Sequence, residues 1–521
     1  MRRSDRLTGK KRPNGTSAAG VAAAGQPRLA VATTPSATSQ ASADSTPTAA
    51  SAAAPSDASA AAGPGSDRGF RFVDRRALLR LAGTAAVVAP ATSLLAACTG
   101  SKGSSGVRPV RIGMVTPQSG ALSSFASADL FVTDHMTTWF KDHGGIAVGN
   151  STHPVQIFVR DSQSTFARAA KATTQLIYED KVDIVLVDAT SDTVNPVADQ
   201  CEVAGVPCIS TMSPWESWYF SRGGDVTLKN PFNWTFHFFA GLNDYYQAYA
   251  SMWGDRVSTD RTVGALWPNS VDGQWFSHPK LPFRQGLDNN WKLVNPKLLD
   301  GKGSQQDYLY QPGTKDFTQV IAAFQAGKVE IVTGILDEAD FAQFERNANS
   351  MSFQPKIITI SKAAMFDNDL RTIGAQVSNN LTTELFWSDS SPNRSFVTNQ
   401  PSKDLGDQYR ASNGRQTTPQ QLGASMALFD VAAQALSAVN SIDDRKSIAT
   451  ALKSLTARTI LGDVKFGARE GLPQNVATIP LNGAQWRWHQ DSYSFDLVQV
   501  NSSGNNALPN QGQLGAITYD T

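Results

Sequence analysis

Histidine and cysteine are scarce in this sequence, and neither type is arranged as catalysis or metal binding requires. The six histidines form no HExxH motif, and His135 and His143 lie on an expected core helix, so we interpret them as structural. A GxSxG elbow, a GxGxxG fingerprint and a Walker loop are also missing. The sequence therefore predicts a protein that is not an enzyme, with no catalytic residue, metal or cofactor. A secreted enzyme whose acid pair forms only on folding is the alternative.

An excess of charge of either sign is missing as well. The chain has 46 Lys and Arg residues against 45 Asp and Glu residues. No long basic stretch interleaved with aromatic residues follows residue 110. This balance lacks the electrostatic signature of nucleic-acid binding, so we expect no nucleic-acid partner.

The first 68 residues contain no aromatic side chain and consist mainly of Ala, Ser, Thr, Pro and Gly. Such a segment cannot bury enough apolar area to offset its loss of conformational entropy. Residues 1–68 are therefore expected to be a disordered low-complexity extension. The alternative is that translation begins nearer Arg71.

A candidate export signal occupies residues 69–97. Arg75 and Arg76 precede a weakly apolar run, an arrangement that resembles a twin-arginine signal. The segment "LAAC" that ends at Cys98 resembles the lipobox of bacterial lipoproteins, which predicts lipidation of Cys98. A membrane-spanning helix is a weaker alternative, because the 17-residue run from Leu81 to Ala97 contains Gly, Pro, Thr and Ser and is shorter than the roughly 20 residues needed. Residues 98–108 are then a flexible tether, and the protein is expected on the outer face of the cytoplasmic membrane.

Two cysteines remain in the body of the chain. Cys201 falls on an expected helix and Cys208 in the next expected strand. In an oxidising compartment they could form a disulfide. Two buried free thiols are the alternative, and the spacing alone does not decide between them.

From residue 110 onward, short apolar runs alternate with segments of helical periodicity. This alternation predicts parallel sheets with helices on both faces. The expected strands are residues 110–116, 155–161, 182–189 and 206–211, then 262–267, 291–299, 329–336 and 356–361. The alternation of strands and helices occurs in two successive series, so we predict an α/β fold of two doubly wound Rossmann-like lobes. Ligands of such sheets bind beyond the carboxyl ends of the strands.

Several segments resemble a known family. They include "RIGMVTPQSGALSSFA", "RDSQSTFARAAKATTQLIYEDKVDIVLVDATSDT", "ADQCEVAGVPCISTMSPW" and "PGTKDFTQVIAAFQAGKVEIVTG". They resemble the periplasmic-binding-protein type I family, specifically substrate-binding lipoproteins of branched-chain amino-acid-type ABC transporters. The resemblance extends from about Val110 to the terminal "DVKFG" segment.

The resemblance implies two lobes joined by a three-crossover hinge, with a small solute held between them and ABC transporter permease subunits as partners. We expect residues 109–238 plus 387–456 in the first lobe and residues 239–386 plus 457–521 in the second. A secreted enzyme or a ligand sensor on the same fold is the alternative function.

The family's binding positions can be transferred to this chain one at a time. The resemblance implies an aromatic contact from Phe125, a hydroxyl contact from Ser191, and contacts from Met212 and Ser213 with Trp215 beside them. From the second lobe it implies contacts from Trp267, Asp272, Leu336 and Lys362. The aromatic residues Trp215, Trp218, Tyr219 and Phe220 could form an apolar stacking wall for the ligand or a cation-binding face, or they could pack within a loop core.

Lys362 departs from the family pattern. Amino-acid binders of this family have an acidic residue at that place, which pairs with the ligand's ammonium group. A lysine would repel an ammonium group and attract an anion. The sequence therefore favours a carboxylate, an amide or an aromatic acid over an ordinary α-amino acid as the solute.

Overall fold

The structure is a computed structural model that describes residues 106–229, 232–254, 261–298, 303–414, 417–504, 508, 510–517 and 519. The expected extension, the export signal, Cys98 and most of the tether lie outside the described residues. Within the described ranges, no helix has the length and apolar character needed to cross a membrane.

The first sheet has six strands in the order β15-β7-β6-β5-β1-β4, and every neighbouring pair is parallel. The strands are β1 (Val110–Thr116), β4 (Val155–Asp161), β5 (Ile184–Val187), β6 (Cys208–Ser210), β7 (Thr235–Phe238) and β15 (Val476–Ala477). β5 and β6 are buried throughout and read as continuous apolar runs because helices cover both faces of the sheet.

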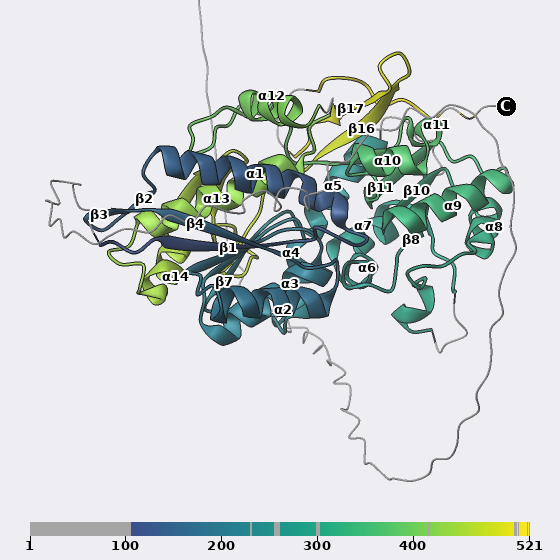
Figure 1. The fold of residues 1–521 in the computed structure, drawn as a ribbon. Helices are drawn as coiled ribbons and strands as arrows, with labels where there is room; N and C mark the ends of the chain where they lie inside the picture. Colours follow the sequence, from purple (N-terminus) through teal and green to yellow (C-terminus); the bar gives the residue numbers. More distant parts are fainter. Residues whose placement is uncertain are drawn as a thin grey trace, which may run out of the picture. The chain divides into compact units, whose positions relative to one another are not determined.

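Helices cover the first sheet on both sides (Figure 1). α1 (Ser123–Asp142) and α13 (Gln421–Ser437) lie on one side of β1, and α2 (Phe166–Tyr178) and α3 (Ser191–Ala204) lie on the other. α4 (Trp215–Ser221), α12 (Ser402–Asn413) and α14 (Arg445–Ser454) complete the lobe, with two short hairpins, β2 (Ile146–Val148) with β3 (Ser151–His153) and β13 (Thr456–Thr459) with β14 (Gly462–Lys465).

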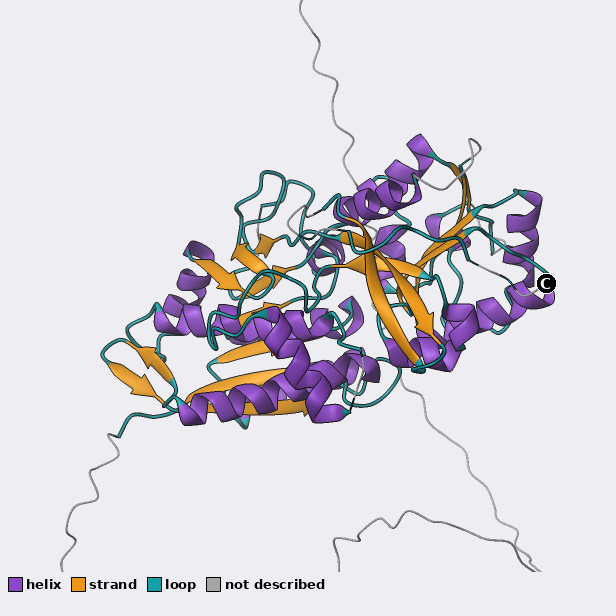
Figure 2. Ribbon diagram, turned by 90° about the horizontal axis from the view of Figure 1, so that it is seen from above, coloured by secondary structure: helices purple, strands orange, loops and turns teal. Residues whose placement is uncertain are grey.

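The second sheet has seven strands in the order β17-β16-β12-β11-β10-β8-β9. Its strands are β8 (Thr262–Leu266), β9 (Lys292–Val294), β10 (Ile331–Leu336), β11 (Ile357–Lys362), β12 (Thr382–Leu385), β16 (Asn482–His489) and β17 (Ser494–Asn501). Strands β8 to β12 are parallel, and the β16–β17 hairpin joins the sheet antiparallel to β12. Figure 2 shows both sheets among their helices.

The helices of the second lobe are α5 (Leu242–Trp253), α6 (Val271–Phe276), α7 (Pro282–Asn290), α8 (Thr318–Ala326), α9 (Glu338–Ser350), α10 (Asp367–Ile373) and α11 (Ala375–Ser378), with a 3₁₀ turn at Gln305–Tyr308. The two-lobed α/β fold predicted from the sequence is therefore confirmed.

The chain passes between the two sheets three times, after β7, after β12 and after β15. The three passages contact one another. The Phe239 ring meets the Phe386 ring edge-on, with centroids 5.1 Å apart, and the Phe239 amide donates to the Ala477 carbonyl at 3.1 Å. These contacts place a compact hinge beside the first sheet.

One expected boundary was wrong. Residues 457–477 were assigned to the second lobe, but β15 pairs in parallel with β7 of the first sheet, and the β13–β14 hairpin packs on α13. The third crossing lies after Ala477, because Val476 and Ala477 bury their side chains in the first lobe. A two-residue strand is too short to show a period in sequence.

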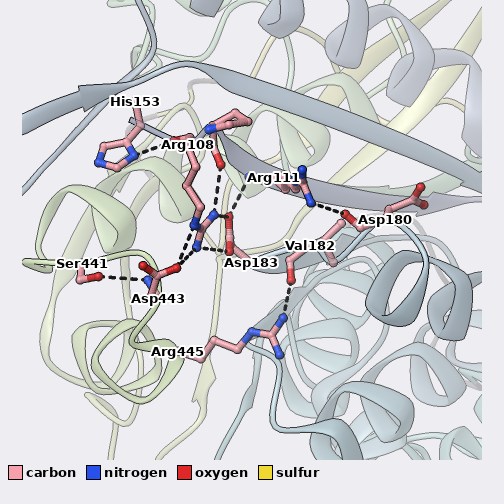
Figure 3. A network of polar contacts seen from close by, with 10 residues as sticks. Arg108, Arg111, His153, Asp180, Val182, Asp183, Ser441, Asp443 and Arg445 are labelled. Carbon is pink, nitrogen blue, oxygen red and sulfur yellow. Dashed lines mark hydrogen bonds and ion pairs between the residues drawn. The ribbon is translucent and has the colours of Figure 1, made fainter. Parts of the chain in front are cut away.

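The start of the body is fixed by a charged network (Figure 3). The Arg108 guanidinium donates to both carboxylate oxygens of Asp183 at 3.0 Å, and its Nε donates to Asp443 at 2.8 Å. The Arg111 amide also donates to Asp183. The chain that follows the tether is thereby held to the segments before β5 and α14.

Cys201 and Cys208 are both free and buried. Of the two alternatives from the sequence, the structure shows the pair of buried thiols. Burial raises the pKa of the Cys201 thiol well above its usual range, and the neighbouring Cys208 raises it further. Neither group is therefore placed as a nucleophile.

Candidate ligand-binding site

The polar site between the lobes begins at the ends of parallel strands. Ser191 opens α3, just after β5, and Ser213 follows β6 in the first lobe. Asp272 lies in α6, after β8, and Lys362 is the last residue of β11 in the second lobe. These are carboxyl ends of strands, where open α/β sheets bind ligands.

Ser191, Ser213 and Asp272 form one buried hydrogen-bonded group across the two lobes. Ser191 Oγ donates to Asp272 Oδ1 at 2.6 Å and makes a short contact with Ser213 Oγ. Ser191 and Ser213 have no exposed surface, and Asp272 is 1% exposed. The structure thus brings together three of the residues predicted for the site, and their contact with a solute stays a prediction.

Lys362 extends this group within the second lobe. Its Nζ lies 3.5 Å from Asp272 Oδ2 and 3.6 Å from Asp337 Oδ1. Burial by itself would lower the pKa of Lys362, but the charges of Asp337, Asp272 and Asp192 outweigh burial and raise it. The lysine is therefore a permanent cation at neutral pH.

Asp192 adds a carboxyl group from the first lobe. Burial raises its pKa, Lys362 lowers it, and the charges of Asp272 and Asp337 raise it again. Three carboxyl groups thus surround a single ammonium group. Lys362 is therefore not the isolated cation expected from the sequence. Its acidic neighbours balance its charge, so the lysine by itself gives no preference for an anionic solute.

Asp192 and Asp337 were missed by the sequence analysis. Asp337 directly follows the buried strand β10, and Asp192 is adjacent to Ser191. A polar residue immediately after a buried parallel strand is a usable signal for such positions. Leu336 was named in place of Asp337, but its side chain is fully buried in the hydrophobic core of the second lobe.

Three residues around the site have positive φ angles without being glycine. Ala189 before the Ser191 turn has φ of 115°, Met212 before Ser213 has 69°, and Lys362 has 63°. Such conformations cost of order 1–3 kcal/mol and persist where the surroundings determine them. Met212 thus shapes the turn that presents Ser213, and it is itself buried.

Ser213 is also held from beneath by His237. The His237 ring contacts the Ser213 carbonyl through Nε2 at 2.7 Å and Ser210 Oγ through Nδ1 at 2.9 Å, and it stacks on Trp218. Burial lowers the pKa of His237 to about 3. The ring is therefore neutral, and it acts as a fixed support of the turn.

A pair of buried carboxyl groups supports the turn before Ser191. Asp129 of α1 and Asp188, directly after β5, both accept hydrogen bonds from Ser425 and Gln421 of α13. Burial raises the pKa of both groups, and the charge of Asp129 raises that of Asp188 further. Both shifts favour the protonated form of the pair, which reduces the repulsion between the two carboxyl groups beneath the site.

Phe125 makes a second contact between the lobes. Its ring, in the first turn of α1, meets the Phe366 ring edge-on with centroids 4.7 Å apart. Ser124 beside it donates a short hydrogen bond to Asp369 of α10. Phe125 is buried by this contact.

Trp215 and Trp267 occupy different surroundings. The half-buried Trp215 packs on Gly241 of the first crossing, and its amide donates to the Ala240 carbonyl at 3.3 Å. Trp267 is buried after β8, and its indole Nε1 has no hydrogen-bond partner among the described residues. Neither ring belongs to the hydrogen-bonded group, so their contact with a solute remains a prediction.

An aromatic contact joins α4 of the first lobe to α6 of the second lobe. The rings of Phe220 and Trp275 lie 5.3 Å apart, and Trp275 Nε1 donates to Ser221 Oγ at 2.5 Å. No group of three or more His, Cys, Asp or Glu side chains suited to a metal ion occurs in the part of the chain that the structure describes. The geometry is that of two lobes meeting over a polar centre.

Comparison with known proteins agrees with this arrangement. The sequence profile of the periplasmic binding protein family matches residues 109–485. No curated protein sequence matches the chain. Solved structures that share its fold include an ABC transporter substrate-binding protein from Sphaerobacter thermophilus, with 17% identity, a TM-score of 0.56, and coverage of 76% of this chain and 97% of that one.

Two further structures have the same fold. A type 1 periplasmic binding protein from Bordetella pertussis has 14% identity and a TM-score of 0.59, and the match covers 75% of this chain and 100% of that one. The branched-chain amino acid transporter substrate binding protein LivJ from Streptococcus pneumoniae, in complex with isoleucine, has 15% identity and a TM-score of 0.54, again over 75% and 100%. The chain therefore belongs to the periplasmic binding protein family, and its two lobes have the type I fold.

Proposed function

We propose that this protein is an extracytoplasmic receptor that captures a small solute between its lobes and delivers it to the permease of an ABC transporter. The observation that carries the proposal is the buried hydrogen bond from Ser191, which also contacts Ser213, to Asp272 at the carboxyl ends of strands from both sheets. Hydroxyl and carboxyl groups at this place can fix the polar end of a small molecule. Membership in the family supports a location outside the cytoplasm.

The work of such a receptor is binding and hinge closure, with no bond made or broken. Three chain passages joined by Phe239 and Phe386 allow the lobes to move as units about one place. Phe125, Met212, Trp215 and Trp267 are proposed to line the solute around the hydroxyl and charged groups of Ser191, Ser213, Asp272 and Lys362. The named solutes of related structures, such as isoleucine for LivJ, make amino acids and their amides the first compounds to test.

The proposed anchor lies outside the described residues. Cys98 is proposed to bear the lipid after removal of the export signal, and residues 98–108 to act as the tether. A receptor that hands its solute to a membrane permease has to remain near the membrane, and this position serves that need.

The test is a thermal-shift screen of the purified chain against amino acids, amides, ureas and aromatic carboxylates. A compound that binds only the folded state raises the melting temperature, and the shift grows with the logarithm of the ratio of its concentration to its Kd. The shift should be lost in Ser191→Ala and reduced in Trp215→Ala. Ser217→Ala is the matched control, because Ser217 is also buried but its hydroxyl has no partner among the described residues.

Two results would contradict the proposal. Chemical turnover of a bound compound by the purified chain would favour the enzymatic alternative. A shift that persists unchanged in Ser191→Ala would place the solute elsewhere in the molecule.

A further inference from the structure

The charged groups at the centre of the interlobe site belong to the chain itself. Asp272 directs one carboxylate oxygen to Ser191 at 2.6 Å and the other toward Lys362 at 3.5 Å. Asp272 is 1% exposed and Lys362 is 8% exposed. One carboxylate and one ammonium group, the polar groups by which proteins recognise many small solutes, are thus already in place.

The partners of these two groups come from both lobes. Ser191 and Ser213 belong to the first lobe, whereas Asp272, Lys362 and Asp337 belong to the second. Opening the lobes would separate Asp272 from the Ser191 hydroxyl, which would keep its contact with Ser213 in the first lobe. Lys362 would keep both of its aspartate partners, because all three residues are in the same lobe.

We propose that the Asp272–Lys362 ion pair acts as an internal ligand: it closes the lobes on the chain's own charges, and a solute binds by displacing the Asp272 carboxylate from Ser191, whose hydroxyl also contacts Ser213. This inference rests on the proposed function, since it concerns the regulation of the same site. The lobes can then close without a solute. They can also open again, because Asp272 and Lys362 remain paired with each other when the lobes separate and neither charge is left buried without a partner.

The internal ligand has a consequence for affinity. A solute competes with Asp272 for the Ser191 hydroxyl. Molecules that are closed on their own charges do not bind the solute, so the apparent affinity for the solute is lowered in proportion to the fraction of molecules in that closed state. Removing the Asp272 carboxylate should therefore open the lobes and leave a carboxylate-sized gap between Ser191, Ser213 and Lys362. A small carboxylate added in solution should fill that gap.

The experiment is small-angle X-ray scattering of the purified chain and its Asp272→Ala variant, with acetate as the probe. Asp272→Ala should increase the radius of gyration, and sodium acetate should return it to the wild-type value. Sodium chloride at the same concentration should not change the radius of gyration of the variant. Asp180→Ala is the matched control, because it removes an aspartate paired at 2.6 Å with Arg160 inside the first lobe, and its radius of gyration should equal that of the wild type.

A second variant distinguishes the loss of the interlobe contact from a folding defect of Asp272→Ala. Ser191→Ala combined with Ser213→Ala removes the other side of the same contact and should give the same expansion, without any response to acetate. An unchanged radius of gyration in both variants overturns the internal ligand. The proposal is also wrong if acetate and chloride change the radius of gyration of Asp272→Ala by the same amount.

The two proposals can fail separately. If a compound of the solute panel shifts the melting temperature but neither variant expands, the receptor stands and the internal ligand is wrong. If the scattering responds as expected but no compound shifts any variant, the internal ligand stands and the receptor function is wrong.

Discussion

Ser191 of the first lobe donates a 2.6 Å hydrogen bond to Asp272 of the second, and both side chains are almost fully buried. The two residues are 81 positions apart in the chain and lie on helices that follow strands of different sheets. A single hydroxyl group therefore links the two lobes at the place where a solute is proposed to bind.

Ser191→Ala should lower the free energy of unfolding by about 1–3 kcal/mol, because the Asp272 carboxylate loses a buried donor. Chemical denaturation monitored by tryptophan fluorescence measures this change. Ser217→Ala should cost much less, since that buried hydroxyl makes no hydrogen bond among the described residues. Equal losses in the two variants would show that the interlobe hydrogen bond contributes nothing.

Glu216, which lies beside the first crossing between the lobes, makes the free energy of unfolding depend on pH. Its carboxylate oxygens both accept from the Leu242 amide at 3.0 Å, and burial raises its pKa to about 8 against the opposing effect of that amide. The folded state therefore holds a proton that the unfolded state releases near pH 4.5. The stabilisation is present below about pH 4.5 and is lost as pH rises to about 8.

Glu216→Gln should remove this contribution, which is on the order of 1–4 kcal/mol across the interval. The measurement is the difference in unfolding free energy between wild type and variant from pH 4.5 to pH 8. The difference should change steadily with pH and level off above 8. A difference independent of pH would contradict the raised pKa.

Gly241→Ala should disturb the hinge. An added Cβ would lie 2.1 Å from the Trp215 indole nitrogen, which forces the ring or the crossing chain to shift. We expect a loss of about 1–3 kcal/mol, typical of overpacking in a buried place, measured by denaturation. Gly254→Ala is the control, because its Cβ would make only ordinary contacts at 3.5 Å, and it should leave stability unchanged or slightly raised.

Arg108→Ala should loosen the junction between tether and body. Asp183, whose side chain is 5% exposed, would lose its bidentate partner, and we expect a loss of about 1–2 kcal/mol. Lys403→Ala removes an exposed ion pair of 2.5 Å with Asp407 and should leave stability almost unchanged, because solvent screens a fully exposed pair. A larger effect of Lys403→Ala than of Arg108→Ala would contradict the importance of the buried carboxylate.

Cys98→Ser should release the protein from the membrane fraction of the producing cell, because the residue that is proposed to bear the lipid is gone. Fractionation followed by immunoblotting measures the distribution. Cys208→Ser, which changes a buried thiol, is the control and should leave the distribution as in the wild type. Unchanged membrane association of Cys98→Ser would rule out the lipid anchor and leave the two-lobed receptor intact.

Much of the fold follows from local patterns. Apolar runs such as "VDIVLVDA" predict strands, because burial on both faces of a parallel sheet requires continuous apolar strands. Apolar residues at helical spacing, as in α2, predict helices. The resemblance predicted that Ser191, Ser213, Asp272 and Lys362 contact a solute. The structure brings these four side chains to one place, and the contact with a solute stays a prediction. The carboxyl ends of strands are a property of topology, so the loops that follow them could be named in advance.

The sequence by itself determined the two α/β lobes, the loops that form the site and the absence of recognised catalytic motifs, since these depend on residue order and periodicity alone. Only the tertiary structure decided the third crossing, where the two residues of β15 join the first sheet, and the charge of the site. The field at Lys362 depends on Asp272 and Asp337, which the fold of the second lobe brings beside it from distant places in the sequence, and on Asp192, which the first lobe supplies. Electrostatic interaction falls with distance in space, so the order of residues could not reveal it.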